Sequence, residues 1–380
     1  MKHVFIIGSR GLPAKYGGFE TFVSELVSNQ KNENIKYHVA NLSQDENQTH
    51  FDYASADVFN IKQRNLGAAR VIFYDLDAIR YCLKMVKDEQ IENPIFYILG
   101  NTIGAFIGPV ARKIHSVGGK LYVNPDGLEW RRSKWSKPIQ MYLKYSEKKM
   151  VEKADLIISD NQGIEDYLEG EYHEVTSKVI AYGTDIDDLD TNQEDLDKFF
   201  EKNKLSKKNY YLVVGRFVPE NNYQSIIENF MKTDSDKDLV IITNCEGSSY
   251  FEELKGLTNF DKDLRIKFVG TVYDKKLLKA IRNDCHAYIH GHEVGGTNPG
   301  LLEALWSTDL NLVFDVNFNR QVAKNSVLYW DKENLSHLIE FSEKLSQEEI
   351  IDKGYQAKSI IKEEYTWDKI VAEYEELFEK

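Results

Sequence analysis

The sequence predicts two successive doubly wound α/β domains, and three observations support this fold class. The chain has 380 residues, a length that suits two domains of ordinary size. Hydrophobic residues make up 42% of it, which is enough for two packed cores. Short β-branched and aromatic runs also alternate with longer segments of helical period, as in βα units around a parallel sheet.

The first half contains five apolar runs that we predict to be strands. They span residues 4–7, 37–42, 95–99, 120–124 and 156–159. Segments with helical period separate them, notably 21–29, 69–87, 104–117 and 138–153. This alternation predicts one parallel sheet with helices on its faces.

The second half begins after a polar stretch, residues 186–209, that is rich in Asp, Asn, Glu and Lys. Strands are predicted again at 210–214, 239–243, 266–269, 287–290 and 311–314, and an amphipathic helix follows Thr366. We therefore expect domains at residues 1–185 and 186–364, and a terminal helical segment at 365–380.

The charge balance bears on the partners of the protein. With 48 Lys and Arg against 61 Asp and Glu, the formal net charge is -13, which argues against a general nucleic-acid binder. Residues 1–185 hold 23 basic and 24 acidic side chains, whereas the remainder holds 25 and 37. The first half is therefore almost neutral and the second half is acidic.

Cysteine use and hydropathy favour a cytoplasmic setting. Three widely separated cysteines, Cys82, Cys245 and Cys285, form neither a disulfide framework nor a CxxC pair. The apolar run near the first residue is too short for a signal peptide, and no run of about 18 apolar residues is present. We expect no integral membrane segment.

Ligands of open α/β sheets bind beyond the carboxyl ends of the strands, so loops that follow strands are the first candidates. The loop at 8–20 contains GSRGLPAKYGGFE, in which Gly17 and Gly18 allow close backbone approach at a helix N-terminus. Its spacing does not match GxGxxG, so a dinucleotide site is poorly supported. The alternative is a flexible loop that needs glycine for its turns.

A second loop, residues 124–132, gathers Asp126, Glu129 and Trp130 with two arginines. Carboxylates can fix sugar hydroxyls and an indole can stack on an apolar sugar face. A Pro-Asp-Gly turn followed by a solvated charged segment explains the same residues without a ligand.

The stretch from residue 131 to 149 contains seven basic residues and one acid, interleaved with aromatic and apolar side chains. Such a segment favours contact with a membrane surface or a lipid phosphate. A solvated charged face is the alternative. The residues expected to touch the membrane are Arg131, Arg132, Lys134, Trp135 and Lys137.

Two loops of the second half suit a diphosphate. Arg216 follows the strand at 210–214 and can hold a diphosphate in a bidentate way, although an ordinary surface Arg is the alternative. After the strand at 287–290, a Gly-rich loop enters a helix near Pro299, whose N–H groups can point at a phosphate. His290 and His292 lack a third ligand, so we expect no metal site.

Four segments together, GSRGLPAKYGGFETF, PDGLEWRRSKW, GRFVPENN and VGGTNPGLLEAL, resemble the GT-B glycosyltransferases, specifically the large retaining family 4. More narrowly, they are similar to bacterial β-1,4-rhamnosyltransferases of capsule and cell-wall polysaccharides. The resemblance spans the whole chain. It implies two Rossmann-like domains facing a cleft, with a final helix that crosses back to the first domain.

The resemblance also implies the substrates. Such enzymes move L-rhamnose from dTDP-rhamnose to the 4-hydroxyl of a GlcNAc or Glc carried on a lipid diphosphate, at the cytoplasmic membrane face and without a metal or other cofactor. The first domain is expected to bind the acceptor and the second to bind the nucleotide sugar.

Residue roles implied by the resemblance fall into three sets. The catalytic candidates are Asp126, Asp160, Tyr182 and Arg216. The donor site comprises Arg216, Gly295, Gly296, Thr297, Asn298, Pro299, Gly300, Leu301 and Glu303, with Glu303 on a sugar hydroxyl of the nucleoside. The acceptor site comprises Tyr16, Gly17, Gly18, Phe19, Asp126 and Glu129.

The sequence departs from the broad family at two positions. Gly295 stands where the first of two paired glutamates is usual, and Asn221 replaces the usual Lys five residues after Arg216. A 6-deoxy sugar and a nucleoside without a 2′-hydroxyl are compatible with this less polar site, and Thr297 and Asn298 can supply neutral hydrogen bonds.

Three alternatives remain at this stage. A related family 4 transferase with a UDP-sugar donor stays within the same class. A non-catalytic two-domain sugar-binding protein and a nicotinamide oxidoreductase belong to other classes. The oxidoreductase is poorly supported, because neither half offers GxGxxG with an acid about 20 residues on.

Overall fold

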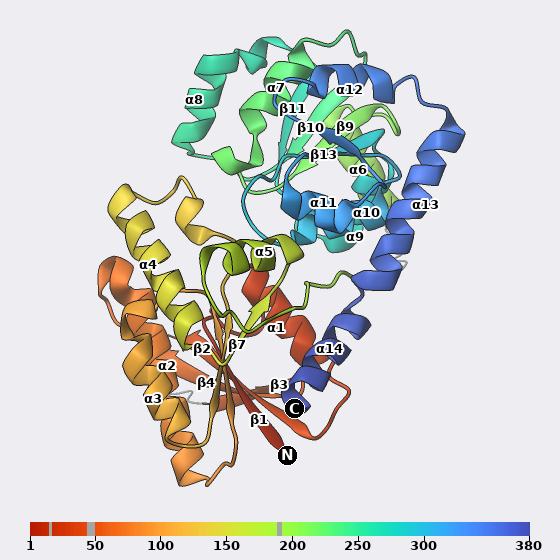
Figure 1. Ribbon diagram of the computed structural model, residues 1–380. Coiled ribbons are helices and arrows are strands. Elements are labelled where there is room, and N and C mark those ends of the chain that lie inside the picture. Colours follow the sequence, from red (N-terminus) through yellow and green to blue (C-terminus); the bar gives the residue numbers. More distant parts are fainter. Residues whose placement is uncertain (15–16, 44–49, 188–191) are drawn as a thin grey trace. The chain divides into compact units, whose positions relative to one another are not determined.

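A computed structural model describes residues 1–14, 17–43, 50–187 and 192–380 (Figure 1). The chain forms two compact units. The first comprises Met1–Gly183 and Trp367–Lys380, and the second comprises Thr184–Thr366. The terminal helix is thus part of the first unit.

The first unit contains a sheet of eight strands within the described residues, in the order β3-β4-β2-β1-β5-β6-β7-β8. Every pair is parallel except β3 with β4. The strands are β1 (Lys2–Ile7), β2 (Ile35–Ser43), β3 (His50–Tyr53), β4 (Ala56–Lys62), β5 (Ile95–Leu99), β6 (Lys120–Asn124), β7 (Leu156–Ser159) and β8 (Ser177–Val179).

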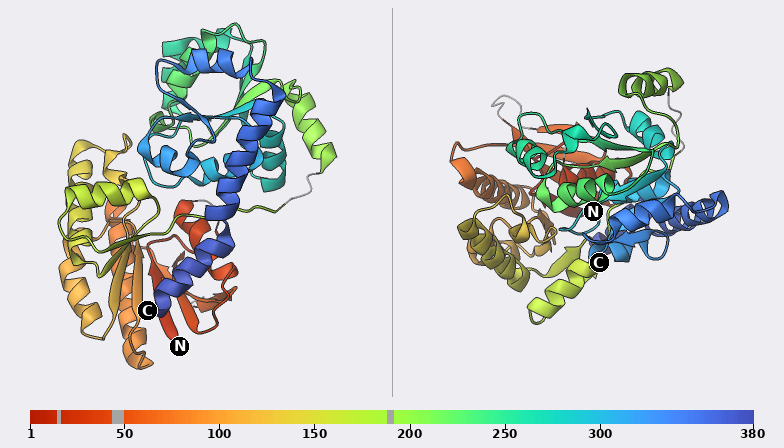
Figure 2. Two further views of the ribbon diagram at one scale, coloured as in Figure 1. Left: turned by 45° about the vertical axis from the view of Figure 1, so that its right-hand side comes forward. Right: turned by 90° about the horizontal axis from the view of Figure 1, so that it is seen from above.

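Helices cover both faces of this sheet. On one face lie α2 (Arg70–Asp88), α3 (Ile107–His115) and α4 (Lys137–Lys153), and on the other lie α1 (Gly18–Ser28) and α14 (Trp367–Glu379) (Figures 1 and 2). A further helix, α5 (Gln162–Glu171), follows β7. The helix α14 buries its apolar stripe, as the helical spacing of its apolar residues predicts.

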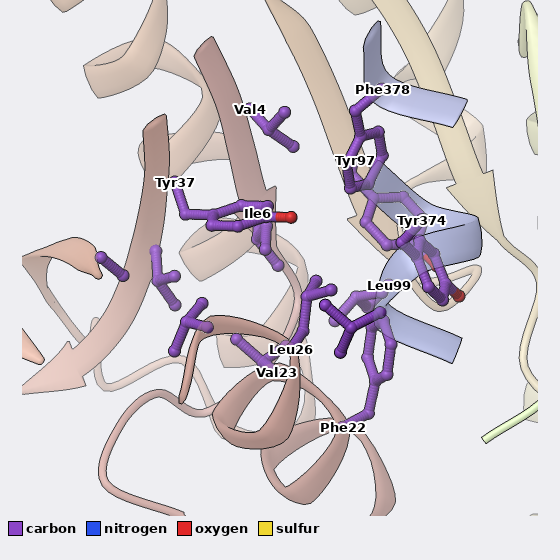
Figure 3. Close-up of a cluster of buried hydrophobic side chains, with 14 of the residues drawn as sticks. Val4, Ile6, Phe22, Val23, Leu26, Tyr37, Tyr97, Leu99, Tyr374 and Phe378 are labelled. Carbon is purple, nitrogen blue, oxygen red and sulfur yellow. The ribbon is translucent and has the colours of Figure 1, made fainter. Parts of the chain in front are cut away.

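Aromatic contacts fix α14 in the core of the first unit (Figure 3). The ring of Tyr374 lies 5.0 Å from that of Phe22 in α1, and its hydroxyl lies 3.0 Å from that of Tyr97 in β5. Phe378 packs against Tyr37 of β2. Such buried rings stabilise the core through both burial and ring geometry. The last helix therefore completes the first hydrophobic core.

The second unit contains a wholly parallel sheet of six strands within the described residues, in the order β11-β10-β9-β12-β13-β14. The strands are β9 (Tyr210–Val214), β10 (Asp238–Ile242), β11 (Ile266–Gly270), β12 (Ala287–His290), β13 (Asn311–Phe314) and β14 (Leu328–Trp330).

Two clusters of buried residues cover the faces of this second sheet. One includes α7 (Tyr223–Met231), α8 (Ser249–Thr258) and α12 (Leu335–Ser342). The other includes α6 (Gln193–Asn203), α9 (Lys275–Asn283) and α10 (Pro299–Ser307). The remaining helices are α11 (Asn317–Ala323) and α13 (Gln347–Glu364).

The predicted fold class, two doubly wound α/β domains, is confirmed. All ten predicted strands are present, and β3, β4, β8 and β14 are additional. None of the helices in the described parts of the chain is both long enough and apolar enough to cross a membrane.

Candidate functional site

Each sheet has a position where the strand order reverses, and this is where such folds bind ligands. In the second unit the reversal lies between β9 and β12, which are parallel neighbours. The loops after these two strands carry Arg216 and residues 291–298. The two diphosphate candidates from the sequence therefore leave the same edge of one sheet, on either side of its switch point.

Arg216 is exposed, and its side chain makes no hydrogen bond or ion pair to any described residue. Its loop is held by Asn221, whose Nδ2 donates to the carbonyl of Arg216 at 2.7 Å. The carbonyl of the preceding Gly215 accepts bonds from Thr243 and Tyr223. A fixed backbone with an open guanidinium suits a group that waits for an anionic ligand.

The loop after β12 is fastened to the loop after β9. His292 donates from Nδ1 to Oδ1 of Asn221 at 2.9 Å, and the N–H of Glu293 donates to the carbonyl of Glu220 at 2.9 Å. A Cβ on Gly291 would lie 2.2 Å from the carbonyl oxygen of Asn221, so only glycine fits there. These contacts make the two loops one assembly.

Gly295 stands where the first of the two paired glutamates is usual, and its backbone conformation disfavours a side chain. Its φ is +147°, a conformation that side chains rarely adopt, and a Cβ would lie 2.8 Å from Nε2 of His292. A glutamate at this position would be strained. The departure from the broad family therefore follows from the conformation of this loop.

The helix α10 begins at Pro299, where the sequence predicts its start, and Asn298 is its N-cap. The cap corrects one expectation. The N–H of Gly300 donates to Oδ1 of Asn298 at 2.8 Å and that of Leu301 donates to its carbonyl at 3.0 Å, so neither is open to a phosphate. The amides before Asn298, including that of Gly296 beside the buried Thr297, are the remaining candidates.

Glu303 lies one turn into α10 with its side chain 43% exposed. Its Oε2 lies 2.7 Å from Nη1 of Arg282, a side chain of α9 that is only 5% exposed. Sequence reasoning missed Arg282, since only the folded chain brings α9 and α10 together. A buried arginine thus holds the carboxylate expected to contact the nucleoside.

No metal centre is visible in the described ranges of the chain, where no group of three or more His, Cys, Asp or Glu side chains could hold an ion. His290 is buried, and this burial lowers the pKa of its imidazole well below the ordinary value. His292 is used as a loop contact instead.

In the first unit the strand order reverses between β1 and β5. The loop after β1 leads into α1, whose cap is Gly17 with φ +131°. Gly18 is exposed, whereas Phe19 packs against the core. Tyr16, expected at the acceptor, lies outside the described residues.

Three catalytic candidates follow neighbouring strands of the first sheet. Asp126 comes after β6, Asp160 after β7 and Tyr182 after β8. Burial, and then the carboxylates of Asp160 and Asp126, raise the pKa of the Tyr182 phenol well above its ordinary value. The structure thus brings these three side chains into one electrostatic environment, although Asp160 and Tyr182 are buried.

Asp126 has a left-handed backbone with φ +58°, and its Oδ1 accepts from the N–H of Gly127 at 2.8 Å. Burial raises the pKa of this carboxyl, with Arg132 acting in the opposite direction. A non-glycine residue at positive φ is uncommon and indicates a turn that its surroundings hold in place. The Pro-Asp-Gly turn is therefore real, and it presents Asp126 at the strand end.

Glu129, another expected acceptor residue, is engaged within its own loop. Its Oε1 accepts from Nε1 of Trp135 at 2.8 Å and lies 2.6 Å from Nζ of Lys134. Its Oε2 lies 2.6 Å from Nε of Arg132. The structure thus uses both oxygens to order the basic segment rather than leaving them for a sugar hydroxyl.

The basic segment is correspondingly less cationic than its sequence suggests. Arg132 and Lys134 share Glu129, and Lys134 is exposed, as are Arg131 and Lys137. Trp130 makes cation–π contacts with Arg131, at 5.0 Å from its ring centroid, and with Lys144, at 4.8 Å. The indole thus helps to hold this loop, a role that the sugar-stacking hypothesis did not include.

Comparisons with known proteins agree with this description of the fold. Residues 195–371 match the family model described as glycosyl transferases group 1, and residues 1–185 match one described as a domain of unknown function (DUF1972). An uncharacterized glycosyltransferase of Methanocaldococcus jannaschii is 25% identical over 341 residues, covering 87% of this chain and 81% of that protein.

Solved structures share the fold. Sucrose-phosphate synthase of Thermosynechococcus elongatus aligns with a TM-score of 0.80 at 13% identity, over 100% of this chain and 98% of that one. HepE of Anabaena, solved in complex with UDP, aligns with a TM-score of 0.72 at 14% identity over 100% of both chains.

The two α/β units have the GT-B fold of these solved structures. The chain is a glycosyltransferase, and the model of the group 1 glycosyltransferases matches its residues 195–371, which include Arg216 and α10.

Proposed function

We propose that this glycosyltransferase moves L-rhamnose from dTDP-rhamnose to the 4-hydroxyl of a GlcNAc or Glc on a lipid diphosphate. The observation that carries the proposal is the pairing of the open Arg216 guanidinium with the Gly-rich loop before α10 at one switch point. Both features favour a diphosphate leaving group. Neither requires a metal ion.

The proposed reaction is a front-face displacement with retention. The bond between the anomeric carbon and the diphosphate oxygen breaks while the acceptor hydroxyl oxygen bonds to the same face of that carbon. The hydroxyl proton passes to the departing diphosphate, so the products are dTDP and the extended glycoside. Arg216 and the amide of Gly296 stabilise the charge that develops on the diphosphate, an effect of about 3 to 4 kcal/mol for one preorganised donor.

The residues around the loop before α10 are the basis for proposing this sugar and this base. The backbone of Gly295, with φ +147°, disfavours the acid that commonly contacts donor hydroxyls, and a site without that acid suits a 6-deoxy sugar. The second candidate is a UDP-sugar donor, which is favoured by the UDP bound to HepE. A screen of nucleotide sugars that measures release of the free nucleotide tests both. The proposal fails if a UDP-sugar turns over and dTDP-rhamnose does not.

We further propose that the first unit binds the acceptor at the cytoplasmic face of the membrane. Asp126, Gly17 and Gly18 lie at the carboxyl edge of the first sheet, where an acceptor sugar would bind. On α4, Met141 and Tyr145 are 74% and 50% exposed, close to the exposed Lys137. Exposed apolar side chains beside a cation suit the interface of an anionic membrane.

A further inference from the structure

The contact between Arg282 and Glu303 carries a consequence for the nucleotide. A carboxylate has two oxygens, and a ribonucleoside offers a 2′- and a 3′-hydroxyl that can use both. Here Oε2 is engaged by Nη1 of Arg282 at 2.7 Å. The other oxygen, Oε1, accepts no hydrogen bond from any described residue.

Arg282 is held firmly in this position. Its residue is 4% exposed, and its carbonyl accepts from Oγ1 of Thr308 and Sγ of Cys285, each at 3.0 Å. Thr308 directly follows α10, so the last turn of α9 is tied to the far end of the helix that carries Glu303. If the guanidinium left the carboxylate, its charge would remain buried without a partner, which is costly.

Charge supports the same arrangement. Glu303 is the only ion-pair partner of Arg282 within the described residues. The pair is neutral, so it does not set a net negative charge against a diphosphate at the start of α10. Arg282 thus both orients Glu303 and cancels its charge.

We propose that Arg282 is a specificity-determining residue that restricts Glu303 to one nucleoside hydroxyl and so favours 2′-deoxyribonucleoside diphosphates. This inference rests on the proposed donor site. A 3′-hydroxyl donates to Oε1 of Glu303, whereas a 2′-hydroxyl next to it loses its water and must compete with Arg282 for Oε2. Leaving a polar group without a partner costs enough to weaken binding about fivefold or more.

Calorimetric titration with dUDP and UDP tests this, because the two ligands differ only in the 2′-hydroxyl. Wild-type protein is expected to bind dUDP about fivefold or more tightly than UDP. In Arg282→Met both oxygens of Glu303 are released, and the ratio is expected to fall to within about twofold of unity. Arg282→Lys keeps a cation on Oε2 and is expected to retain the discrimination.

Arg265→Met is the matched control. Arg265 also forms an ion pair, with Asp263 (2.7 Å), but the pair lies just before the edge strand β11 and not on α9 or α10. It should leave the ratio unchanged. A purely structural role for Arg282 would weaken both ligands equally, and an unchanged ratio in Arg282→Met would overturn the inference. Equal binding of dUDP and UDP by wild type would overturn it even if Arg282→Met failed to fold. Binding of neither by wild type would overturn the proposed donor site as well.

Discussion

His292 donates a hydrogen bond from Nδ1 to Oδ1 of Asn221 at 2.9 Å, and this contact joins the two loops at the switch point of the second sheet. Nδ2 of the same Asn221 donates to the carbonyl of Arg216 at 2.7 Å. One amide thus holds both sides of the proposed diphosphate site. This is a physical reason for asparagine where the broad family usually has lysine, because a lysine could not accept from His292.

Removal of this amide should impair use of the donor. In Asn221→Ala two hydrogen bonds of about 1 kcal/mol each are lost, so kcat/KM for the nucleotide sugar should fall about tenfold or more. Steady-state kinetics at varied donor concentration measure this. Asn203→Ala serves as the control, because Asn203 donates to a carbonyl of its own helix α6. Equal kinetics for the two variants would show that Asn221 does not organise the site.

Gly295 should not tolerate a side chain. Gly295→Ala forces a Cβ toward Nε2 of His292 at φ +147°, so we expect a loss of stability of about 1 to 2 kcal/mol and weaker donor binding. Gly256→Ala in α8 meets no atom within 4 Å and should stabilise the protein by about 0.5 to 1 kcal/mol. Thermal melting compares the two variants. Shifts of the same sign would contradict the role given to the Gly295 backbone.

The second unit should lose stability in mild acid. Burial, and then the positive charge of Lys237, lower the pKa of His286 to about 4. The unfolded chain takes up a proton near pH 6.5 and the folded chain does not. The stabilisation is therefore present above pH 6.5 and is lost as the pH falls toward 4.

Between pH 7 and pH 5 the loss due to His286 should be about 2 kcal/mol. His286→Gln cannot titrate, so its melting temperature should fall less over this range than that of wild type. An identical fall in both proteins would show that His286 is not the group responsible.

The exposed face of α4 should matter only for an acceptor in a membrane. Lys137→Gln combined with Met141→Ser should reduce activity on a vesicle-embedded acceptor several-fold, since it removes a cation and an exposed apolar side chain. Activity on a short soluble analogue should not change. Lys120→Gln, at the amino end of β6, is the control. Equal losses on both acceptors would reject a membrane role for this face.

Neutralising Arg132 and Lys134 should behave differently from the change on α4. Both are paired with Glu129, so Arg132→Gln with Lys134→Gln should disturb the loop after β6 and lower activity on both acceptors. Parallel assays on the two acceptors measure this. A loss confined to the vesicle-embedded acceptor would instead mean that these two cations contact the membrane directly.

The sequence was sufficient to predict the central strands other than β4, because buried parallel strands are continuous apolar runs such as residues 95–99 and 210–214. The edge strands β3, β8 and β14 were missed for the opposite reason. The strand β3 reads His-Phe-Asp-Tyr with exposed and half-buried positions, and β8 and β14 have three residues each. Such short edges carry little pattern.

The candidate loops could be located because each directly follows a predicted strand. The contacts within them could not be predicted. Arg282 meets Glu303 across two helices, and His292 meets Asn221 across 71 positions of sequence. These pairs depend on side-chain conformations in the folded chain, and no local pattern records them. For the same reason Glu129 was assigned to an acceptor while the structure commits it to its own loop.

Product formation from dTDP-rhamnose tests the central claim most directly. Purified protein is incubated with dTDP-rhamnose and an acyl-diphosphate-linked GlcNAc or Glc, and mass spectrometry follows the acceptor. We predict that the acceptor gains one deoxyhexose and that Arg216→Ala lowers this rate about 10²- to 10³-fold while remaining folded. No gain of deoxyhexose by either acceptor, together with glycosylation from another nucleotide sugar, would contradict the account.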